Sequence, residues 1–271
     1  MRINTNIAAY NAFRNLNMTN DNLSKSLEKL SSGYRINRAA DDAAGLVISQ
    51  SLRAQVSGLN VAVRNAQDGV SVVQTAEGSL NEVAAMLNRM RDLAVQASNT
   101  GSTDATAAAA AQSEIDALTA EITRVSQQTS FGTNTLLDGA FVKVFQIGAN
   151  AGQYLTVSLG TSLNASALGV SALGVASTAS ASVAITAIDA AIATVSTTRA
   201  SLGAFQNRFQ SVINGLQVSV ENLSASESRI RDTDMASEMV NFTKQQILLQ
   251  AGTAMLAQAN QVPQTVLKLI Q

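Results

Sequence analysis

The sequence predicts a mainly α protein with long antiparallel coiled-coil helices, arranged as a terminal pair plus a helical bundle, and with a small β-hairpin region. Apolar residues recur at helical spacing toward both ends of the chain. Between about residues 130 and 175 the spacing changes to period two and glycines become frequent. The 271 residues are 46% apolar but only 4% aromatic, with one proline, so thin helix contacts lined by alanine are favoured over a thick globular core.

An apolar stripe near the N-terminus predicts one long helix that stops or bends near Ser31, Ser32 and Gly33. The following segment, RINRAADDAAG at 35–45, is charged and is expected to be a connector. Its Asp41 and Asp42 are expected either to be solvated or to cap a helix. The stripe consists of Ile3, Ile7, Tyr10, Leu16, Asn20, Leu23, Leu27, Leu30 and Tyr34.

Two further stripes, within 52–73 and 76–97, keep a strict alternation of four and three residues, which is the period of a coiled coil. Gly78 lies where their registers meet. A shorter helix is predicted within 115–125, where isoleucine, leucine and valine again follow helical spacing.

The middle of the chain predicts a β-hairpin. Its strands are FVKVFQI at 141–147 and QYLTVSL at 153–159, and they are separated by GANAG. Helical spacing then returns within 185–195 and 205–223. A polar, charged segment, SASESRIRDTD at 224–234, is expected to interrupt the helices before a terminal helix that begins near Met235.

The terminal helix carries an apolar stripe from Leu248 to Leu269, and Pro263 is expected to kink this helix or to begin a short non-helical tip. An antiparallel pair of terminal helices would bury only one stripe of each and leave several large side chains without cover. Another copy of the same chain is the expected partner for them. The side chains expected to pack between subunits are Ile3, Ile7, Leu23, Leu27, Leu30, Leu248, Met255, Leu256, Val262, Val266, Leu267, Leu269 and Ile270.

The composition argues against an enzyme. Without His or Cys, the chain cannot form a Ser-His-Asp triad, a Cys-His pair or an ordinary zinc site, and its carboxylates lie singly or in short pairs. No catalytic residue, cofactor or metal ligand is therefore expected. The formal net charge of −1, without a basic stripe, argues against nucleic acid as a partner. The N-terminus lacks the apolar core of a signal peptide, and no apolar stretch is expected to insert into a membrane.

Five motifs are long enough to be specific: LSSGYRINRAADDAAGLVIS at 30–49, RNAQDGVSVVQTAEGSLNEV at 64–83, MRDLAVQASN at 90–99, LGAFQNRFQSVI at 202–213 and QILLQAGTAMLAQANQVPQTVL at 246–267. They cover both terminal regions and most of the chain between them. In this order they closely resemble the motifs of bacterial flagellin.

The resemblance implies a structural subunit that polymerises into the flagellar filament for motility. It implies that residues 1–44 and 232–271 form a coiled-coil inner-tube domain and that 45–231 form a helical outer-tube domain with the hairpin region at about 130–175. A separate variable outer domain is not expected, because only about forty-five hairpin and loop residues lie in mid-chain.

The resemblance also implies secretion to an extracellular flagellum through the flagellar secretion apparatus, with an export chaperone, and contact with the filament cap and junction proteins. LNRMRDLAVQ at 87–96 is similar to the helix of flagellins that contacts the vertebrate Toll-like receptor for flagellin. It implies possible receptor contacts at Arg89, Leu93 and Glu114, in the monomer only. Two alternatives stay open: the hook–filament junction protein and, from a different class, a coiled-coil signalling protein.

Overall fold

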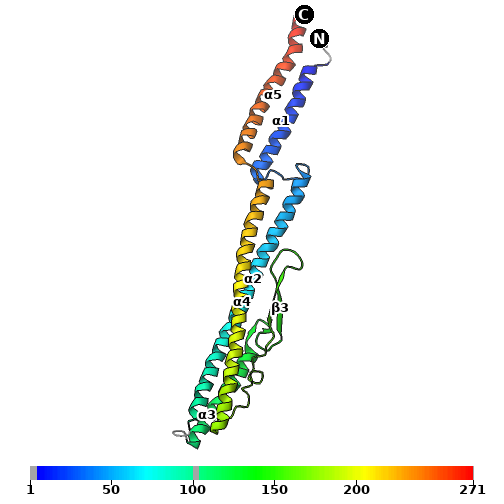
Figure 1. The fold of residues 1–271 in the computed structure, drawn as a ribbon. Coiled ribbons are helices and arrows are strands. Elements are labelled where there is room, and N and C mark those ends of the chain that lie inside the picture. The colour runs from blue at the N-terminus through cyan, green and yellow to red at the C-terminus, as the bar shows by residue number, and fades with distance from the viewer. Residues whose placement is uncertain (1–4, 100–103, 271) are drawn as a thin grey trace. The chain divides into compact units, whose positions relative to one another are not determined.

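The computed structural model describes the backbone of residues 5–99 and 104–270. Side chains are described for residues 5–99 and 104–262. Over these ranges the chain forms five helices and four short strands (Figure 1). The helices are α1 (Ile7–Ser32), α2 (Ala43–Ala97), α3 (Ala105–Gln128), α4 (Thr178–Arg231) and α5 (Met235–Ile270). The strands are β1 (Ser130–Phe131), β2 (Asn134–Thr135), β3 (Phe141–Gln146) and β4 (Tyr154–Leu159). The mainly α fold predicted from the sequence is confirmed.

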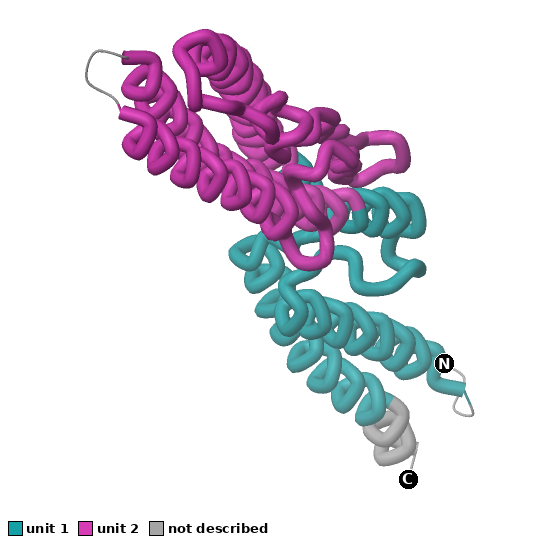
Figure 2. Tube along the Cα trace, turned by 90° about the horizontal axis from the view of Figure 1, so that it is seen from below, with its two compact units in different colours: residues 1–54, 222–271 teal, residues 55–221 magenta. Residues whose placement is uncertain are grey.

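The chain divides into two compact units (Figure 2). Unit 1 comprises Met1–Ala54 and Asn222–Gln271, and unit 2 comprises Gln55–Glu221. Helices α2 and α4 contribute to both, because each crosses a boundary between them. In unit 1 the N- and C-terminal helices lie side by side, with both ends of the chain at the same end of the pair (Figure 1).

Unit 1 is an antiparallel pair of α1 and α5 with a thin seam. The least exposed positions of each helix recur at alternating steps of three and four, which is the spacing of a coiled-coil seam. The helices approach closely at Gly252, where an added Cβ would lie 3.0 Å from Cδ1 of Leu16. The seam positions are Ala9, Ala12, Leu16, Thr19, Leu23, Ser26 and Leu30 on α1, and Glu238, Phe242, Gln245, Leu249, Gly252, Leu256 and Ala259 on α5.

Both ends of α1 are capped by local hydrogen bonds. The side chain of Asn6 accepts a hydrogen bond from the backbone N–H of Ala9, and its Nδ2 donates to the carbonyl of Ala259 at 2.8 Å. At the other end Gly33 adopts a φ of 73°, a left-handed conformation that suits glycine, and its N–H donates to the carbonyl of Lys29. The helix therefore ends where the sequence predicts.

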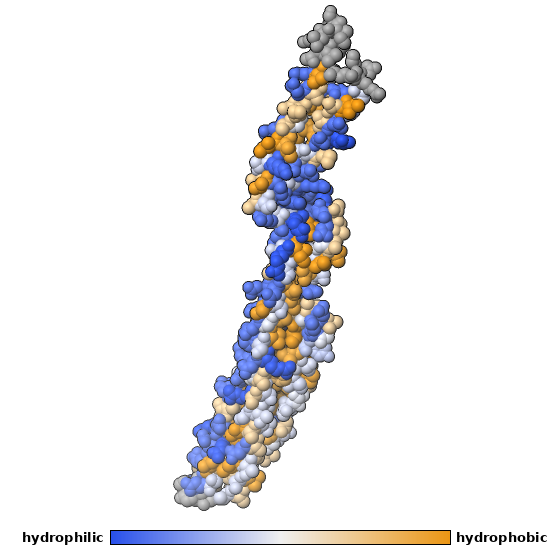
Figure 3. Space-filling model, turned by 45° about the horizontal axis from the view of Figure 1, so that its top comes forward, coloured by the Kyte–Doolittle hydropathy of each residue, from blue (hydrophilic) through white to orange (hydrophobic). Residues whose placement is uncertain are grey.

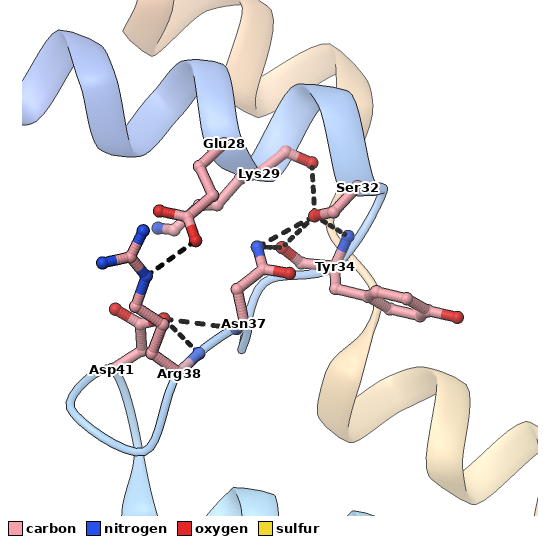
Figure 4. A network of polar contacts seen from close by, with 7 residues as sticks. All are labelled: Glu28, Lys29, Ser32, Tyr34, Asn37, Arg38 and Asp41. Carbon is pink, nitrogen blue, oxygen red and sulfur yellow. Dashed lines mark hydrogen bonds and ion pairs between the residues drawn. The ribbon is translucent and has the colours of Figure 1, made fainter.

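The connector between α1 and α2 is held by hydrogen bonds to its two aspartates, and Figure 4 shows those of Asp41. Asp41 Oδ2 accepts hydrogen bonds from the backbone N–H groups of Arg38, at 3.0 Å, and Asn37, at 3.2 Å. These bonds hold the pKa of the Asp41 carboxyl below its usual value. Asp42 Oδ1 accepts from the N–H of Gly45 and so caps α2. Of the two expected roles, Asp42 therefore takes that of a helix cap, whereas Asp41 stabilises the connector and caps no helix.

The two connectors of unit 1 pair with each other. Tyr34 and Asp232 form an antiparallel bridge. It is flanked by hydrogen bonds from the N–H of Arg35 to the carbonyl of Arg231, at 2.7 Å, and from the N–H of Thr233 to the carbonyl of Gly33, at 2.9 Å. The guanidinium of Arg231 lies 4.4 Å from the centroid of the Tyr34 ring.

Two sequence expectations about helix ends are corrected. The segment 224–231 is not a break, because α4 continues to Arg231 and only 232–234 interrupt the helices. The stripes within 52–73 and 76–97 lie in one helix, α2, which passes through Gly78. Helix α5 continues through position 263 to Ile270, so the expected non-helical tip is wrong. Polar residues and single glycines or prolines weaken a helix locally, but neighbouring turns can continue it.

Unit 2 has the larger core, built from its parts of α2 and α4 together with α3 and the segments around the hairpins. The predicted hairpin is confirmed: β3 and β4 are antiparallel, from the pair Phe141–Leu159 to the pair Gln146–Tyr154. A second, shorter hairpin, β1–β2, was not predicted. Among the largest fully buried side chains are Leu80, Leu87, Met90, Ile115, Ile122, Ile188, Leu202 and Phe209.

The hairpin packs against one face of α2. An added Cβ at Gly58 would lie 3.0 Å from Cβ of Ala149, and Asn65 Nδ2 donates to the carbonyl of Gln146 at 3.0 Å. An added Cβ at Gly69 would lie 2.5 Å from the ring of Phe209, so only glycine leaves room for that ring. Phe145 from β3 meets Phe209 edge to face, with centroids 5.4 Å apart.

The side-chain amide of Gln112 on α3 binds the segment that follows the β3–β4 hairpin. Gln112 Nε2 donates to the carbonyl of Leu173, and its Oε1 accepts from the N–H of Val175, both at 2.8 Å. Ser126, also on α3, donates to the carbonyl of Leu137 at 3.0 Å. Three backbone groups of the irregular segments are therefore satisfied by side chains of α3.

Among the described residues one helix, α4, is long and apolar enough to cross a membrane by length and composition. The apolar face of α4 is part of the unit 2 core, where Ile188, Val195, Leu202 and Phe209 are buried. Its composition is therefore explained by packing within unit 2.

Candidate assembly surface

Helix α5 carries a second apolar surface besides its seam. We call Met239, Val240, Ile247, Leu248 and Met255 the α5 outer face; their exposed fractions range from 45% to 68%. Met239, Val240, Ile247 and Leu248 line one depression together with Thr243 and Lys244.

A second depression lies between α1 and α5. It is lined by Ala12, Asn15, Leu16 and Thr19 of α1 and by Leu248, Ala251, Gly252 and Met255 of α5. Because Leu248 lines both depressions, the apolar surface is continuous from Met239 to Met255.

The seam and the outer face of α5 are formed by residues that are next to each other in the sequence. Leu249 lies on the seam and Leu248 on the outer face, although consecutive residues of a helix are only about 100° apart. A helix that is apolar over so much of its circumference is typically buried on more than one side. The seam with α1 covers one side, and the outer face is open in the single chain.

Helix α1 exposes large apolar side chains in the same unit. Ile7, Tyr10, Phe13, Met18 and Leu27 are each more than half exposed, the most open being Tyr10 at 70%. At the start of α2, Val47 and Ile48 are also exposed. Figure 3 shows apolar patches between polar ones on the visible face of the molecule.

The structure separates the side chains expected to pack between subunits into three groups. Ile7, Leu27, Leu248, Met255 and Val262 are exposed. Leu23, Leu30 and Leu256 are half-buried at seam positions, so the expectation that Leu256 lacks cover within the chain is wrong. Leu256 follows Leu249 by seven residues and therefore shares its side of α5. The side chains of Ile3, Val266, Leu267, Leu269 and Ile270 lie outside the described residues.

Sequence reasoning missed part of the exposed set. Phe13, Met18, Met239 and Val240 were not among the expected packing residues, because the search followed a single regular stripe. The signal that could have found them is a large apolar residue next to a stripe rather than on it.

The described part of the chain holds no group of three or more acidic side chains that could bind a metal ion. Few charges border the apolar surface of unit 1. Lys244 lines one depression, and Lys29 of α1 lies 4.0 Å from Glu238 of α5. This arrangement can bury apolar area against a partner, and it offers no pair of groups that activate a nucleophile or transfer a proton.

The residues expected to contact an immune receptor lie in unit 2. Arg89 of α2 donates from Nε to Glu114 Oε1 of α3 at 2.7 Å and from a terminal nitrogen to Oε2 at 3.1 Å, which raises the pKa of Arg89. Both side chains are about half exposed. Leu93 of α2 is 4% exposed and belongs to the unit 2 core, so its side chain presents little surface in the single chain.

Exposed apolar helix faces, a thin intramolecular seam and the absence of a reactive cluster among the described residues define a structural subunit that associates through helices. The chain belongs to the bacterial flagellin family. Family models described as the bacterial flagellin N-terminal and C-terminal helical regions match residues 3–142 and 185–270. The unmatched 143–184 segment contains β4 and the beginning of α4, so the chain lacks a separate variable outer domain.

Curated relatives match over their full length. The chain is 48% identical over 305 residues to "Flagellin" of Bacillus subtilis (strain 168), and 49% identical over 274 residues to "Flagellin" of Halalkalibacterium halodurans, with 100% of both chains covered in each case. It is 45% identical over 288 residues to "Flagellar filament 33 kDa core protein" of Treponema phagedenis, again covering both chains completely. The chain is accordingly a structural subunit of the bacterial flagellar filament, an extracellular appendage, and not an enzyme.

Solved structures agree on the fold. A crystal structure of Bacillus cereus flagellin matches with a TM-score of 0.51 and 28% identity, covering 60% of this chain and 94% of that one. A structure titled as a putative flagellar hook-associated protein from Vibrio parahaemolyticus has a TM-score of 0.59 but 15% identity, covering 71% of this chain and 100% of that one, so it shows a shared fold alone. Neither the junction-protein nor the signalling alternative is favoured over the filament subunit.

Proposed function

We propose that the α5 outer face and the exposed apolar side chains of α1 make the contacts between subunits of the filament. The observation that carries this proposal is a continuous apolar surface from Met239 to Met255 beside a seam that α1 already fills. Fully burying one large aliphatic side chain is worth about 1.5–3 kcal/mol, so several such side chains supply a substantial driving force. A contact that repeats head to tail without closing produces a helical fibre.

The proposal assigns different roles to the two parts of the chain. Residues 1–44 and 232–271 form the inner tube, where the long α1–α5 pair buries its outer faces against neighbouring copies. Residues 45–231 form the outer tube, including the hairpin region at about 130–175. The contrast between the thin seam of unit 1 and the larger core of unit 2 supports this division, because unit 2 buries most of its large apolar side chains internally.

A charge on the outer face tests the proposal. We expect Leu248→Glu to abolish polymerisation, since the contact would have to bury an unpaired carboxylate. Leu248 is 45% exposed, so the monomer should keep the circular dichroism and thermal unfolding of the wild type. Leu248→Met is the matched control: it keeps an uncharged apolar side chain of similar volume at the same position and should polymerise nearly normally.

Sedimentation of seeded protein separates the outcomes. Loss of the pelleted fraction for Leu248→Glu alone supports the outer-face contact. Normal filaments from Leu248→Glu, or equal loss in both variants, would show that the α5 outer face is not the contact.

The same exposed surface explains why further partners are proposed. Before assembly it is suited to an export chaperone that covers α5 during passage to the flagellar secretion apparatus. At the ends of the filament it is suited to the cap and junction proteins, whose contact helices would have to replace a neighbouring subunit. A competition experiment tests this: a bound chaperone should slow seeded polymerisation, and an unchanged rate would contradict a shared surface.

A second candidate function concerns recognition of the monomer by the Toll-like receptor for flagellin. The Arg89–Glu114 pair favours it, because an exposed arginine held in a bidentate ion pair is a preorganised contact. We expect Arg89→Ala to weaken binding of the receptor ectodomain about tenfold. Arg91→Ala, which removes a comparable ion pair to Asp189, is the control and should bind as the wild type does. Equal affinities of all three proteins would contradict the assignment.

A further inference from the structure

The methionines of this chain fall into two environments. Of the seven, Met90 is 0% exposed in the unit 2 core, and Met86 is half-buried against that core. Met18, Met235, Met239 and Met255 all lie in unit 1, with exposed fractions of 58%, 47%, 49% and 64%. Met1 lies outside the described residues. The exposed thioethers are therefore concentrated in the unit with the open apolar surface.

Met239 and Met255 are the two methionines of the α5 outer face. Met239 lines a depression with Val240 and Ile247, and Met255 lines the neighbouring depression. Leu248 lies in both depressions and joins them. An unbranched thioether adapts its shape to an irregular apolar contact, but it is also the apolar side chain that an oxidant can make polar.

We propose that Met239 and Met255 are oxidation sites at which peroxide reversibly prevents this chain from polymerising. The inference rests on the proposed function of the α5 outer face. In each step a sulfur lone pair attacks one oxygen of hydrogen peroxide, the O–O bond breaks, an S–O bond forms and water leaves. The thioether is oxidised by two electrons to a sulfoxide, and the peroxide is reduced.

Oxidation acts on the free subunit and not on the finished filament. In the single chain both sulfur-bearing side chains are open to solvent, whereas a contact over the outer face excludes a water-borne oxidant. The sulfoxide oxygen is a strong hydrogen-bond acceptor, and a contact over the mainly apolar depression removes the water that solvates it in the free subunit. Subunit addition therefore weakens, and filaments that formed before exposure to peroxide are protected.

The experiment treats monomers with hydrogen peroxide, removes the peroxide with catalase and measures the critical concentration for seeded polymerisation. We expect it to rise about tenfold for the wild type, the change that one lost apolar contact produces. Met239→Leu/Met255→Leu conserves side-chain volume without a thioether and should stay within about twofold of its untreated value. Met235→Leu, which replaces an exposed methionine that belongs neither to the α5 outer face nor to the exposed apolar set of α1, is the matched control and should remain as sensitive as the wild type.

Two further readouts complete the test. Peptide mass analysis should show one added oxygen at Met239 and Met255 well before Met86 or Met90, and methionine sulfoxide reductases of both epimer specificities should restore polymerisation. The inference is overturned if fully oxidised Met239 and Met255 leave the critical concentration unchanged, or if the Met239→Leu/Met255→Leu variant is inhibited as strongly as the wild type.

Different results would show that the proposed outer-face contact itself is wrong. Untreated wild type that does not polymerise, or Leu248→Glu that does, overturns the outer-face contact and with it the oxidation mechanism. The Met239→Leu/Met255→Leu variant could itself polymerise poorly without peroxide. In that case the oxidised wild type, treated with the reductases, gives the answer. Restored polymerisation supports the inference, and failure to polymerise after all methionines are reduced overturns it.

Discussion

A chain that lacks residues 248–271 should remain monomeric under conditions in which the full chain forms filaments. The deletion removes Leu248 and Met255 from the outer face and also Leu249 and Leu256 from the seam. Helix α1 then loses the partner for much of its length, so neither surface of the pair can be completed. We expect no sedimenting polymer after seeding, at any concentration at which the full chain assembles.

The same deletion should leave residues 45–231 folded. The unit 2 core is formed by α2, α3, α4 and the segments between them, and it includes no residue of α5. Its thermal unfolding, followed by circular dichroism or resistance to proteolysis, should match that of the full chain. Fibres formed by the truncated chain would contradict the assigned role of the C-terminal helix, and loss of the unit 2 transition would contradict the independence of its core.

Phe209→Ala should produce the largest loss of stability from a single substitution in unit 2. The side chain is 0% exposed, lies over Gly69 of α2 and meets the Phe145 ring edge to face. Truncation leaves a cavity where three segments meet, because the bare backbone at Gly69 cannot fill the space. A buried phenylalanine replaced by alanine typically costs about 3–5 kcal/mol.

Urea unfolding of unit 2 measures this effect. Phe131→Ala removes the same ring from a site that is 39% exposed in β1, and it should cost less than about 1 kcal/mol. A similar free energy of unfolding for the two variants would contradict the view that Phe209 joins the hairpin to the helices. Gly69→Ala tests the same contact from the α2 side. The added methyl group would collide with the Phe209 ring, so this variant should also lower the stability of unit 2.

Much of the fold follows from local patterns in the sequence. The period of the apolar residues predicts α1, α2, α3 and α5, and the alternation around GANAG predicts the β3–β4 hairpin. The position of Asp42 before a helical stripe is consistent with its role as a cap of α2. In each case the signal is contained within a few turns of chain, and no distant contact is needed to read it.

The details that sequence reasoning got wrong depend on tertiary contacts. The stripe from Leu248 to Leu269 cannot reveal that α1 packs beside Leu249, because adjacent apolar residues give two overlapping stripes and either could be the seam. The burial of Leu93 in the unit 2 core is likewise not visible in its local sequence. The charged segment 224–231 suggested a break, whereas polar residues on an exposed helix face satisfy the same pattern.

The β1–β2 hairpin was missed for a related reason. Strands of two residues, Ser130–Phe131 and Asn134–Thr135, are too short to show an alternating pattern. The sequence predicted an exposed apolar surface on the terminal helices but not all of the residues that form it. Exposure depends on which face of each helix is covered by its partner.

Electron microscopy of the purified, heat-depolymerised protein, seeded in ammonium sulfate, tests the central claim most directly, because the salt strengthens apolar burial. The account predicts long filaments of uniform diameter from the full chain alone. Persistent monomers at every protein and salt concentration would contradict self-assembly through the exposed faces of α1 and α5.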